Sequence, residues 1–193
     1  MSTEDLLFQD EIKNVVRSVY QEIPTGGGED VATKLYAAEE LDEVPAGAVT
    51  WALGVGNPVR HAGLTSGETV VDLGSGGGID SILAARRVGP TGRVIGVDLL
   101  DEMVERASDN ARSAGVADWT EFVRGEMEDL PLPDTSVDVV ISNGVINLSP
   151  RKSRVFAEIF RVLRPGGRMC VSDLTVEDDL PPEIMTSDAA WAG

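Results

Sequence analysis

Apolar and polar residues alternate along this chain in blocks that predict strands and helices in turn. From residue 68 onward, short, mostly apolar runs predict strands at 68–73, 93–97, 120–124, 137–142 and 168–172. Between them, apolar residues recur every three or four positions and predict helices at 79–88, 101–114 and 150–163. In the last of these, Ser149 is expected at the cap and Pro150 in the first turn, and Pro165-Gly166-Gly167 is expected to end it. Apolar strands separated by helices indicate a parallel sheet covered on both faces. With right-handed crossovers, this pattern predicts an α/β fold with a doubly wound, mostly parallel sheet.

The first 66 residues predict helices rather than strands. Apolar residues at helical spacing predict an amphipathic helix over residues 3–20. Asn57 followed by Pro58 is typical of an N-cap and the first residue of a short helix. We therefore expect two parts, an N-terminal helical cap or lid over residues 1–66 and a ligand-binding domain over residues 67–193.

The first predicted strand ends in a glycine-rich loop, and the second ends in an acid. Gly74, Gly76 and Gly78 have no Cβ, so the chain can turn sharply there and a ligand can approach its backbone. The helix that follows directs its N–H groups and its dipole toward whatever lies over the loop. Asp98 at the end of the second strand can accept both hydroxyls of a ribose. The arrangement predicts a βαβ unit that binds a nucleotide-like ligand.

Two residues distinguish the expected ligand from a nicotinamide dinucleotide. The dinucleotide fingerprint has Gly or Ala at the sixth position of G-x-G-x-x-G, and here that position is Ile79. Asp72, just before the loop, would repel a pyrophosphate but suits a cationic ligand. S-adenosylmethionine has a ribose, an ammonium and a sulfonium and needs no phosphate site, so we expect it as the cofactor. The alternatives are a nicotinamide-dependent dehydrogenase and a purely structural βα turn.

Further candidate contacts lie at the other strand ends, because ligands of open parallel sheets bind there. Leu99 can flank an adenine, Glu126 and the Met127 backbone can meet its polar edge, and Asn143 can take the ligand ammonium. A solvated acidic turn is the alternative at Glu126, and a tight turn is the alternative at Gly56. The expected cofactor-binding residues are Asp72, Gly74, Ser75, Gly76, Gly78, Asp98, Leu99, Met103, Glu126, Met127, Asn143, Gly56 and Asn57.

No residue is assigned a catalytic role, because a sulfonium is already an activated methyl donor. The protein mainly has to align donor and acceptor and exclude water, so a dedicated base is optional. His61, the only histidine, is expected to be incidental and partly exposed. Cys170 is the only cysteine, which excludes an internal disulfide and a cysteine metal cluster, and no metal site is expected.

Charge and composition limit the classes of molecule that this chain is expected to bind. The 193 residues carry a formal net charge of −17, so phosphate backbones and anionic lipids are repelled. We therefore expect a small-molecule acceptor, with neither nucleic acid nor a membrane as a partner. The sequence shows no signal peptide and no long apolar segment, so the expected compartment is the cytoplasm. An excess of acids with few lysines is the pattern expected of a salt-adapted protein or of a GC-rich source.

Several segments resemble the arsenite methyltransferases, a family of class I S-adenosylmethionine-dependent methyltransferases. They are residues 54–58, 72–80, 92–98, 139–150 and 162–168. The resemblance covers about residues 31–193. It implies a Rossmann-like methyltransferase fold, S-adenosylmethionine as methyl donor and arsenite as acceptor.

The chain departs from this family where the family binds arsenic. The resemblance implies As(III)-binding cysteines at two positions that here are Val55 and Gly144. Cys170, within the predicted fifth strand, is expected to pack as a small core residue. As(III) needs soft ligands and none converge here, so a small organic acceptor is an alternative to arsenite. A non-catalytic cofactor-binding module, or a fragment of a longer protein, is the remaining alternative.

The end of the chain is also unlike that of class I methyltransferases, which usually add two more strands that form an antiparallel edge. Here residues 181–193 predict only the start of a helix. We therefore expect the C-terminal antiparallel strands to be absent and the domain to be truncated after its fifth strand. The strand at 168–172 would then lie near an uncovered sheet edge through which an oligomer can form.

Overall fold

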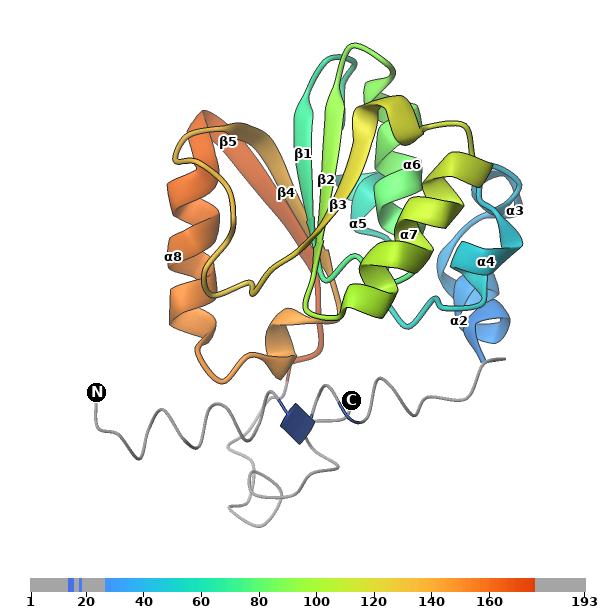
Figure 1. Cartoon of the computed structure of the whole chain (residues 1–193), viewed down its shortest axis with the longest axis horizontal. Coiled ribbons are helices and arrows are strands. Elements are labelled where there is room, and N and C mark those ends of the chain that lie inside the picture. Colours follow the sequence, from blue (N-terminus) through green and yellow to red (C-terminus); the bar gives the residue numbers. More distant parts are fainter. Residues whose placement is uncertain (1–13, 16–17, 19–26, 176–193) are drawn as a thin grey trace.

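The computed structural model describes residues 14–15, 18 and 27–175, and these residues contain one five-stranded parallel sheet (Figure 1). Its strands are β1 (Thr69–Leu73), β2 (Arg93–Asp98), β3 (Thr120–Arg124), β4 (Val137–Asn143) and β5 (Leu163–Ser172). They lie in the order β3-β2-β1-β4-β5, so the order reverses between β1 and β4. The predicted doubly wound α/β fold is confirmed, and within the described residues no antiparallel strand follows β5.

Helices cover both faces of the sheet (Figure 1). One face carries α6 (Ile79–Val88) and α7 (Asp101–Ser113), together with the N-terminal helices α2 (Gly28–Leu35), α3 (Ala38–Leu41), α4 (Ala46–Val49) and α5 (Pro58–His61). The other face carries α8 (Lys152–Val162), and the short 3-10 turns η1 (Ala117–Trp119) and η2 (Ile146–Leu148) precede β3 and α8. None of the described helices is long and apolar enough to cross a membrane. The predicted cytoplasmic location remains a prediction.

Alternation along the strands divides the core into two layers. Successive side chains of a strand point to opposite faces, so Val70 packs toward α6 while Val71 packs toward α8. The N-terminal helices share the α6 layer, where Ala32 and Tyr36 are buried in the same cluster as Val70. The predicted helix over residues 3–20 lies almost entirely outside the described residues. The predicted division of the chain at residue 66 stays a prediction.

The start of α8 differs from the sequence prediction, which put Ser149 at its cap and Pro150 in its first turn. The helix begins at Lys152, and its N-cap residue Arg151 makes no side-chain capping bond. Ser149 Oγ instead accepts the Arg151 N–H at 3.0 Å and donates to the Glu128 carboxylate at 2.6 Å. Ser149 therefore closes the turn before the helix and ties it to the β3–β4 loop.

The start of β5 also differs, because Pro165-Gly166-Gly167 was predicted to separate helix and strand. Leu163 pairs with Val137 and Arg168 pairs with Val139, so residues 164–167 bulge opposite a single residue of β4. Gly166 has a φ of +85°, a left-handed conformation that favours glycine. Cys170 packs against the α6-side core but is only partly buried, and burial raises the pKa of its thiol.

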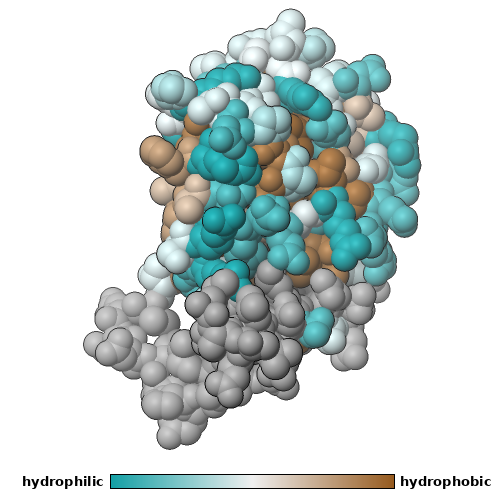
Figure 2. All heavy atoms as spheres, turned by 60° about the vertical axis from the view of Figure 1, so that its left-hand side comes forward, coloured by the Kyte–Doolittle hydropathy of each residue, from teal (hydrophilic) through white to brown (hydrophobic). Residues whose placement is uncertain are grey.

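One edge of the sheet is formed by β5, and all of its residues are at least partly exposed. Met169 of β5 and the α8 residues Phe156 and Phe160 are exposed apolar side chains. Figure 2, which brings this side of the molecule forward, shows apolar side chains at the surface among hydrophilic ones. The predicted oligomer through this edge stays a prediction.

Candidate functional site

A cleft lies at the switch point, over the carboxyl ends of the strands. Its floor is the β1–α6 glycine loop, and one wall is formed by the end of β2 and the start of α7. The turn after β3 and the turn after β4 complete the walls. Residues 51–54, which follow α4, also line the cleft and are called the roof below. This is the location expected for a ligand of an open parallel sheet.

Most of the predicted contact residues line this cleft: Gly74, Ser75, Gly76, Asp98, Leu99, Met103, Glu126, Met127 and Asn143. Asp72 and Gly78 are buried outside the lining, and an added Cβ at Gly78 would lie 3.1 Å from Ala107 Cβ of α7. Gly56 and Asn57 are also outside the lining, and Gly54 lines the cleft instead. His61 is exposed and does not line the cleft.

Asn57 is the N-cap of α5, as its sequence context predicts. Its Oδ1 accepts the Arg60 N–H at 3.1 Å, and its Nδ2 donates to Glu40 Oε2 at 3.1 Å. Glu40 also pairs with the Arg60 guanidinium at 2.6 Å. The side chain of Asn57 therefore faces the N-terminal helices and is engaged there.

Backbone N–H groups hold Asp98 at the end of β2. Its Oδ2 accepts the Gly76 N–H at 2.9 Å, and its Oδ1 accepts the Leu100 N–H at 3.0 Å. Burial raises the pKa of Asp98, and these backbone hydrogen bonds oppose the rise. A carboxylate offers about four lone-pair sites, so each oxygen keeps a position for a further donor. Two such positions side by side suit the two hydroxyls of a ribose.

Two buried carboxylates lie near the β4 side of the glycine loop. Asp72 accepts the Ser81 hydroxyl at 2.6 Å, and Asp80 accepts the Tyr36 hydroxyl and Asn143 Nδ2, both at 2.9 Å. Burial raises the pKa of Asp80 to about 6, and burial together with the Asp80 charge raises the pKa of Asp72. Among the described residues, neither carboxylate forms an ion pair. A positively charged ligand would supply the countercharge that the protein does not.

Sequence reasoning missed Asp80, which lines the cleft while the predicted Asp72 lies beneath it. The available signal was an acid in the first turn of the helix that follows the glycine loop. It also missed Trp51, whose ring lies 4.1 Å from the Arg106 guanidinium carbon and lines the cleft. No local pattern marks Trp51, because its segment approaches the cleft only through tertiary packing.

Asn143 connects β4 to the residues that follow the roof. Its Oδ1 accepts the N–H groups of Val55 and Gly56 at 2.9 and 3.0 Å. Its Nδ2 donates to the Gly56 carbonyl at 2.8 Å as well as to Asp80. An added Cβ at Gly54 would lie 2.2 Å from Nδ2, so this close approach requires glycine. The Asn143 side chain is thus engaged within the protein, and its predicted contact with an ammonium remains a prediction.

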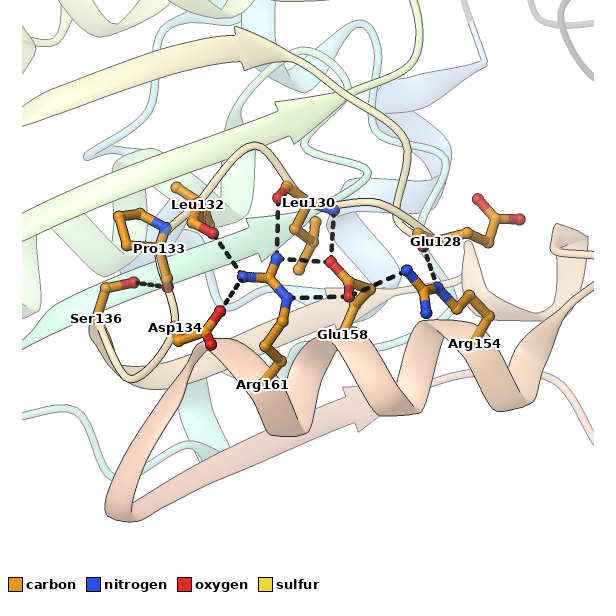
Figure 3. A network of polar contacts seen from close by, with 9 residues as sticks. All are labelled: Glu128, Leu130, Leu132, Pro133, Asp134, Ser136, Arg154, Glu158 and Arg161. Carbon is orange, nitrogen blue, oxygen red and sulfur yellow. Dashed lines mark hydrogen bonds and ion pairs between the residues drawn. The ribbon is translucent and has the colours of Figure 1, made fainter.

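A polar network from α8 fixes the wall formed by the β3–β4 loop (Figure 3). Glu158 accepts the Leu130 N–H at 2.9 Å and the Arg161 guanidinium at 2.6 Å. Arg161 also donates to the carbonyls of Leu130 and Leu132, at 3.0 and 2.7 Å. Arg154 donates to the Glu128 carbonyl at 3.0 Å, so α8 holds the loop on both sides of residue 129.

The family described as a methyltransferase domain matches residues 64–193 of this chain. An arsenite methyltransferase of Halobacterium salinarum is 46% identical over 158 residues, which are 82% of this chain and 40% of that protein. A ubiquinone/menaquinone biosynthesis C-methyltransferase of Salmonella arizonae is 37% identical over 115 residues, 59% of this chain and 45% of that protein. The chain thus spans less than half the length of these curated relatives.

A solved structure shares the fold over most of the chain. It is the crystal structure of an arsenic (III) S-adenosylmethionine methyltransferase from Chlamydomonas reinhardtii, with a TM-score of 0.66 and 35% sequence identity. The match covers 91% of this chain and 54% of the algal protein. It therefore includes the N-terminal helices as well as the sheet.

Proposed function

The chain belongs to the methyltransferase domain family, and from this premise we propose that it transfers a methyl group from S-adenosylmethionine to a small-molecule acceptor. The observation that carries the proposal is the pairing of two features in one cleft. Asp98 offers free acceptor positions at one end, and Asp72 and Asp80, which form no ion pair within the described part of the chain, lie near the other. A ribose and a cationic amino-acid portion are the two parts of the donor that these features suit.

The residues present fit this donor. Ser75 Oγ of the glycine loop is buried and has no hydrogen-bond partner among the described residues, which leaves it for a ligand atom. An added Cβ at Gly76 would meet nothing within 4 Å, so there is space over the loop. When bound, S-adenosylmethionine supplies an activated methyl group on its sulfonium. The task of the chain is then to bind, orient and exclude water.

We propose an organic acceptor in preference to the arsenite or arsenic (III) named for the archaeal and algal relatives. The positions at which the resembling family has arsenic-binding cysteines are Val55 and Gly144 here, and neither can hold As(III). Cys170, the only cysteine, lies on β5 outside the cleft lining. A non-catalytic cofactor-binding module remains the second candidate.

The test combines binding and turnover on one sample. Calorimetry measures S-adenosylhomocysteine binding, and labelled S-adenosylmethionine is then offered with arsenite plus glutathione and with a panel of small thiols, phenols and amines. We expect binding and transfer to an organic acceptor. Methylated arsenic would refute the organic preference, binding without any product would favour the non-catalytic module, and absence of binding would refute the proposal.

A further inference from the structure

The roof carries an aromatic side chain that lines the cleft from outside the sheet. Trp51 is the first of the roof residues and lines the cleft with them. An added Cβ at Gly77 would lie 3.0 Å from Trp51 Cβ, so the tryptophan lies directly against the glycine loop. A large, rigid ring at this position adds apolar surface beside the place that a ligand occupies over the loop.

A cation covers one face of the Trp51 ring. The guanidinium carbon of Arg106, on α7, lies 4.1 Å from the ring centroid. Glu102, one turn earlier on α7, pairs with the same guanidinium. Arg106 Nε is buried and has no hydrogen-bond partner among the described residues, so the ring and Glu102 hold the guanidinium. The stack fixes the plane of the indole relative to α7.

The segment before the roof is anchored to the same helix, because α4 packs on α7 (Figure 1). An added Cβ at Gly47 of α4 would lie 2.5 Å from Asn110 Oδ1 of α7. Asn110 Nδ2 in turn donates to the Gly77 carbonyl at 2.8 Å. Asn110 thus contacts α4 and holds the glycine loop, while Arg106, one turn earlier, contacts Trp51. The position of the Trp51 ring is therefore set by α7 and the loop.

The α7 side of the cleft is also the side of Asp98. Asp98 ends β2 just before α7, and Met103 lines the cleft three residues before Arg106. Because the free carboxylate positions of Asp98 suit a ribose, Trp51 lies toward the nucleoside of the proposed donor. The charge of Arg106 favours the same part. A sulfonium on the ring would add a second cation beside the guanidinium, whereas adenosine is neutral.

We propose that Trp51 covers the nucleoside of bound S-adenosylmethionine and that Arg106 is a positioning residue that acts through Trp51. The inference rests on the proposed methyltransferase function and adds two residues away from the strand ends to its donor site. The nucleoside is common to S-adenosylmethionine, S-adenosylhomocysteine and 5′-methylthioadenosine, so Trp51 should contribute equally to the binding of all three. A contact with the amino-acid part would be missing in 5′-methylthioadenosine.

Calorimetry with S-adenosylhomocysteine and 5′-methylthioadenosine tests the Trp51 contact. We expect Trp51→Ala to weaken both ligands by the same factor, about tenfold, the scale of an aromatic ring packed on a base. Trp51→Phe keeps a ring and should stay within about threefold of the wild-type affinity. A loss confined to S-adenosylhomocysteine, or no loss for either ligand, would overturn the proposal.

Tryptophan emission provides a readout that a merely structural role would not change. Saturating S-adenosylhomocysteine should alter the emission of the wild-type chain, and Trp51→Phe should abolish this ligand-induced change. Trp119→Phe is the matched control, because Trp119 donates to the Ala85 carbonyl and lies outside the cleft lining. The control should keep both the ligand-induced change and the affinity. A change that persists in Trp51→Phe, or no change in the wild-type chain, would contradict the contact.

The charge at residue 106 separates positioning from packing. Arg106→Met keeps most of the apolar stem but removes the cation, so it should weaken both ligands by about threefold. Arg106→Lys restores a cation and should recover part of this loss. Wild-type affinity in the methionine variant, or no recovery in the lysine variant, would overturn the role of Arg106.

Two results keep this inference distinct from the proposed function. Failure of the wild-type chain to bind S-adenosylhomocysteine would count against the methyltransferase proposal itself. Normal wild-type binding that does not respond to substitution of Trp51 would overturn the nucleoside cover alone.

Discussion

At the scale of single residues, Asp98 is the side chain whose role is defined most sharply. Replacing it with alanine removes the acceptor of two backbone N–H groups and the two free positions beside them. We expect Asp98→Ala to weaken S-adenosylhomocysteine binding by about 1.5–3 kcal/mol, the scale of hydrogen bonds to a charged group. Calorimetry measures the affinity, and circular dichroism checks the fold.

Asp138→Ala is a suitable control for this prediction. Asp138 also accepts a backbone N–H, that of Thr69 at 2.8 Å. It lies near the start of β4, at the end of the sheet away from the cleft. The control is expected to lose stability without losing ligand affinity. An Asp98→Ala protein that folds and binds normally would exclude the ribose contact.

The buried carboxyl of Asp80 predicts a pH dependence of stability. Burial raises its pKa to about 6 from 3.8, with hydrogen bonds from Asn143 and Tyr36 opposing the rise and Glu40 adding to it. A raised carboxyl pKa gives stability that is present at low pH and is lost as pH rises through about 6. Between pH 5 and 7.5 the loss from this group is about 1 kcal/mol in the ligand-free chain.

Urea unfolding at the two pH values measures this loss. Asp80→Asn removes the titrating group, so its free energy of unfolding should fall less over the same interval. The variant is expected to start lower, because one amide N–H group then faces the donors Tyr36 and Asn143. Equal slopes for the two proteins would show that Asp80 does not titrate with a pKa near 6, contrary to the prediction.

Local chemistry explains which site residues sequence reasoning found. Gly74 and Gly76 follow β1 and Asp98 is the last residue of β2, so their place at the strand ends is encoded within a few residues. The contact of Tyr36 with Asn143 joins residues 107 positions apart, and no local pattern encodes it. Gly56 and Asn57 were placed at the cleft because a glycine turn before a helix suits a ligand. They lie outside its lining because the Asn57 side chain turns to α5 and Glu40.

At the scale of elements, the α8 network of Figure 3 predicts that removing one of its members lowers the stability of the protein more than breaking an exposed ion pair does. Glu158 is 3% exposed, and Arg161→Met would leave its carboxylate with the Leu130 N–H and, among the described cations, only the more distant Arg154 at 3.7 Å. Removing one partner of a buried pair costs about 3–5 kcal/mol. We expect Arg161→Met to lower the free energy of unfolding by about 3 kcal/mol, at the lower end of that range, because the Arg161 side chain is 29% exposed. Urea unfolding measures the change.

Arg112→Met on α7 is the matched control, since Asp109 and Arg112 have the same helical spacing as Glu158 and Arg161. Asp109 and Arg112 are both largely exposed, so Arg112→Met is expected to lower the free energy of unfolding by about 0.5 kcal/mol or less. Because the network holds the β3–β4 loop, Arg161→Met should also weaken S-adenosylhomocysteine binding. Equal costs for the two variants would contradict a structural role of the α8 network.

The elements themselves were predictable except where contacts override a local signal. Strands and helices followed from apolar periodicity, and the parallel order followed from the βαβ pattern. The proline and glycines at 165–167 read as a break, yet β4 continues alongside them and they form a bulge within β5. Pro150 was predicted to lie in the first turn of a helix. The hydrogen bond from Ser149 to Glu128 instead holds this segment in a separate turn before α8.

At the scale of the whole molecule, the net charge of −17 predicts a response to salt. Self-repulsion between acids destabilises the folded chain, and raising the ionic strength to 1 M shortens the Debye length to about 3 Å. We expect the free energy of unfolding to rise by about 1 kcal/mol between 0.05 and 1 M KCl, or roughly 2–4 °C in Tm. Thermal unfolding in a KCl series measures the rise. A stability maximum at low salt would contradict both the repulsion argument and the salt-adapted interpretation of the composition.

The acids near the glycine loop have a consequence for turnover. A methyl donor with a sulfonium and an ammonium is attracted by Asp72 and Asp80, whereas the spent product keeps the ammonium but carries a neutral thioether, so it loses the sulfonium's share of that attraction. Product inhibition should therefore be weak for a methyltransferase, and it should strengthen where acidification neutralises these carboxyls. A competition titration at pH 5.5 and 7.5 would show it as a donor-to-product affinity ratio that grows with pH. The same buried charges that reduce the stability of the empty protein would then help to clear its site after each cycle.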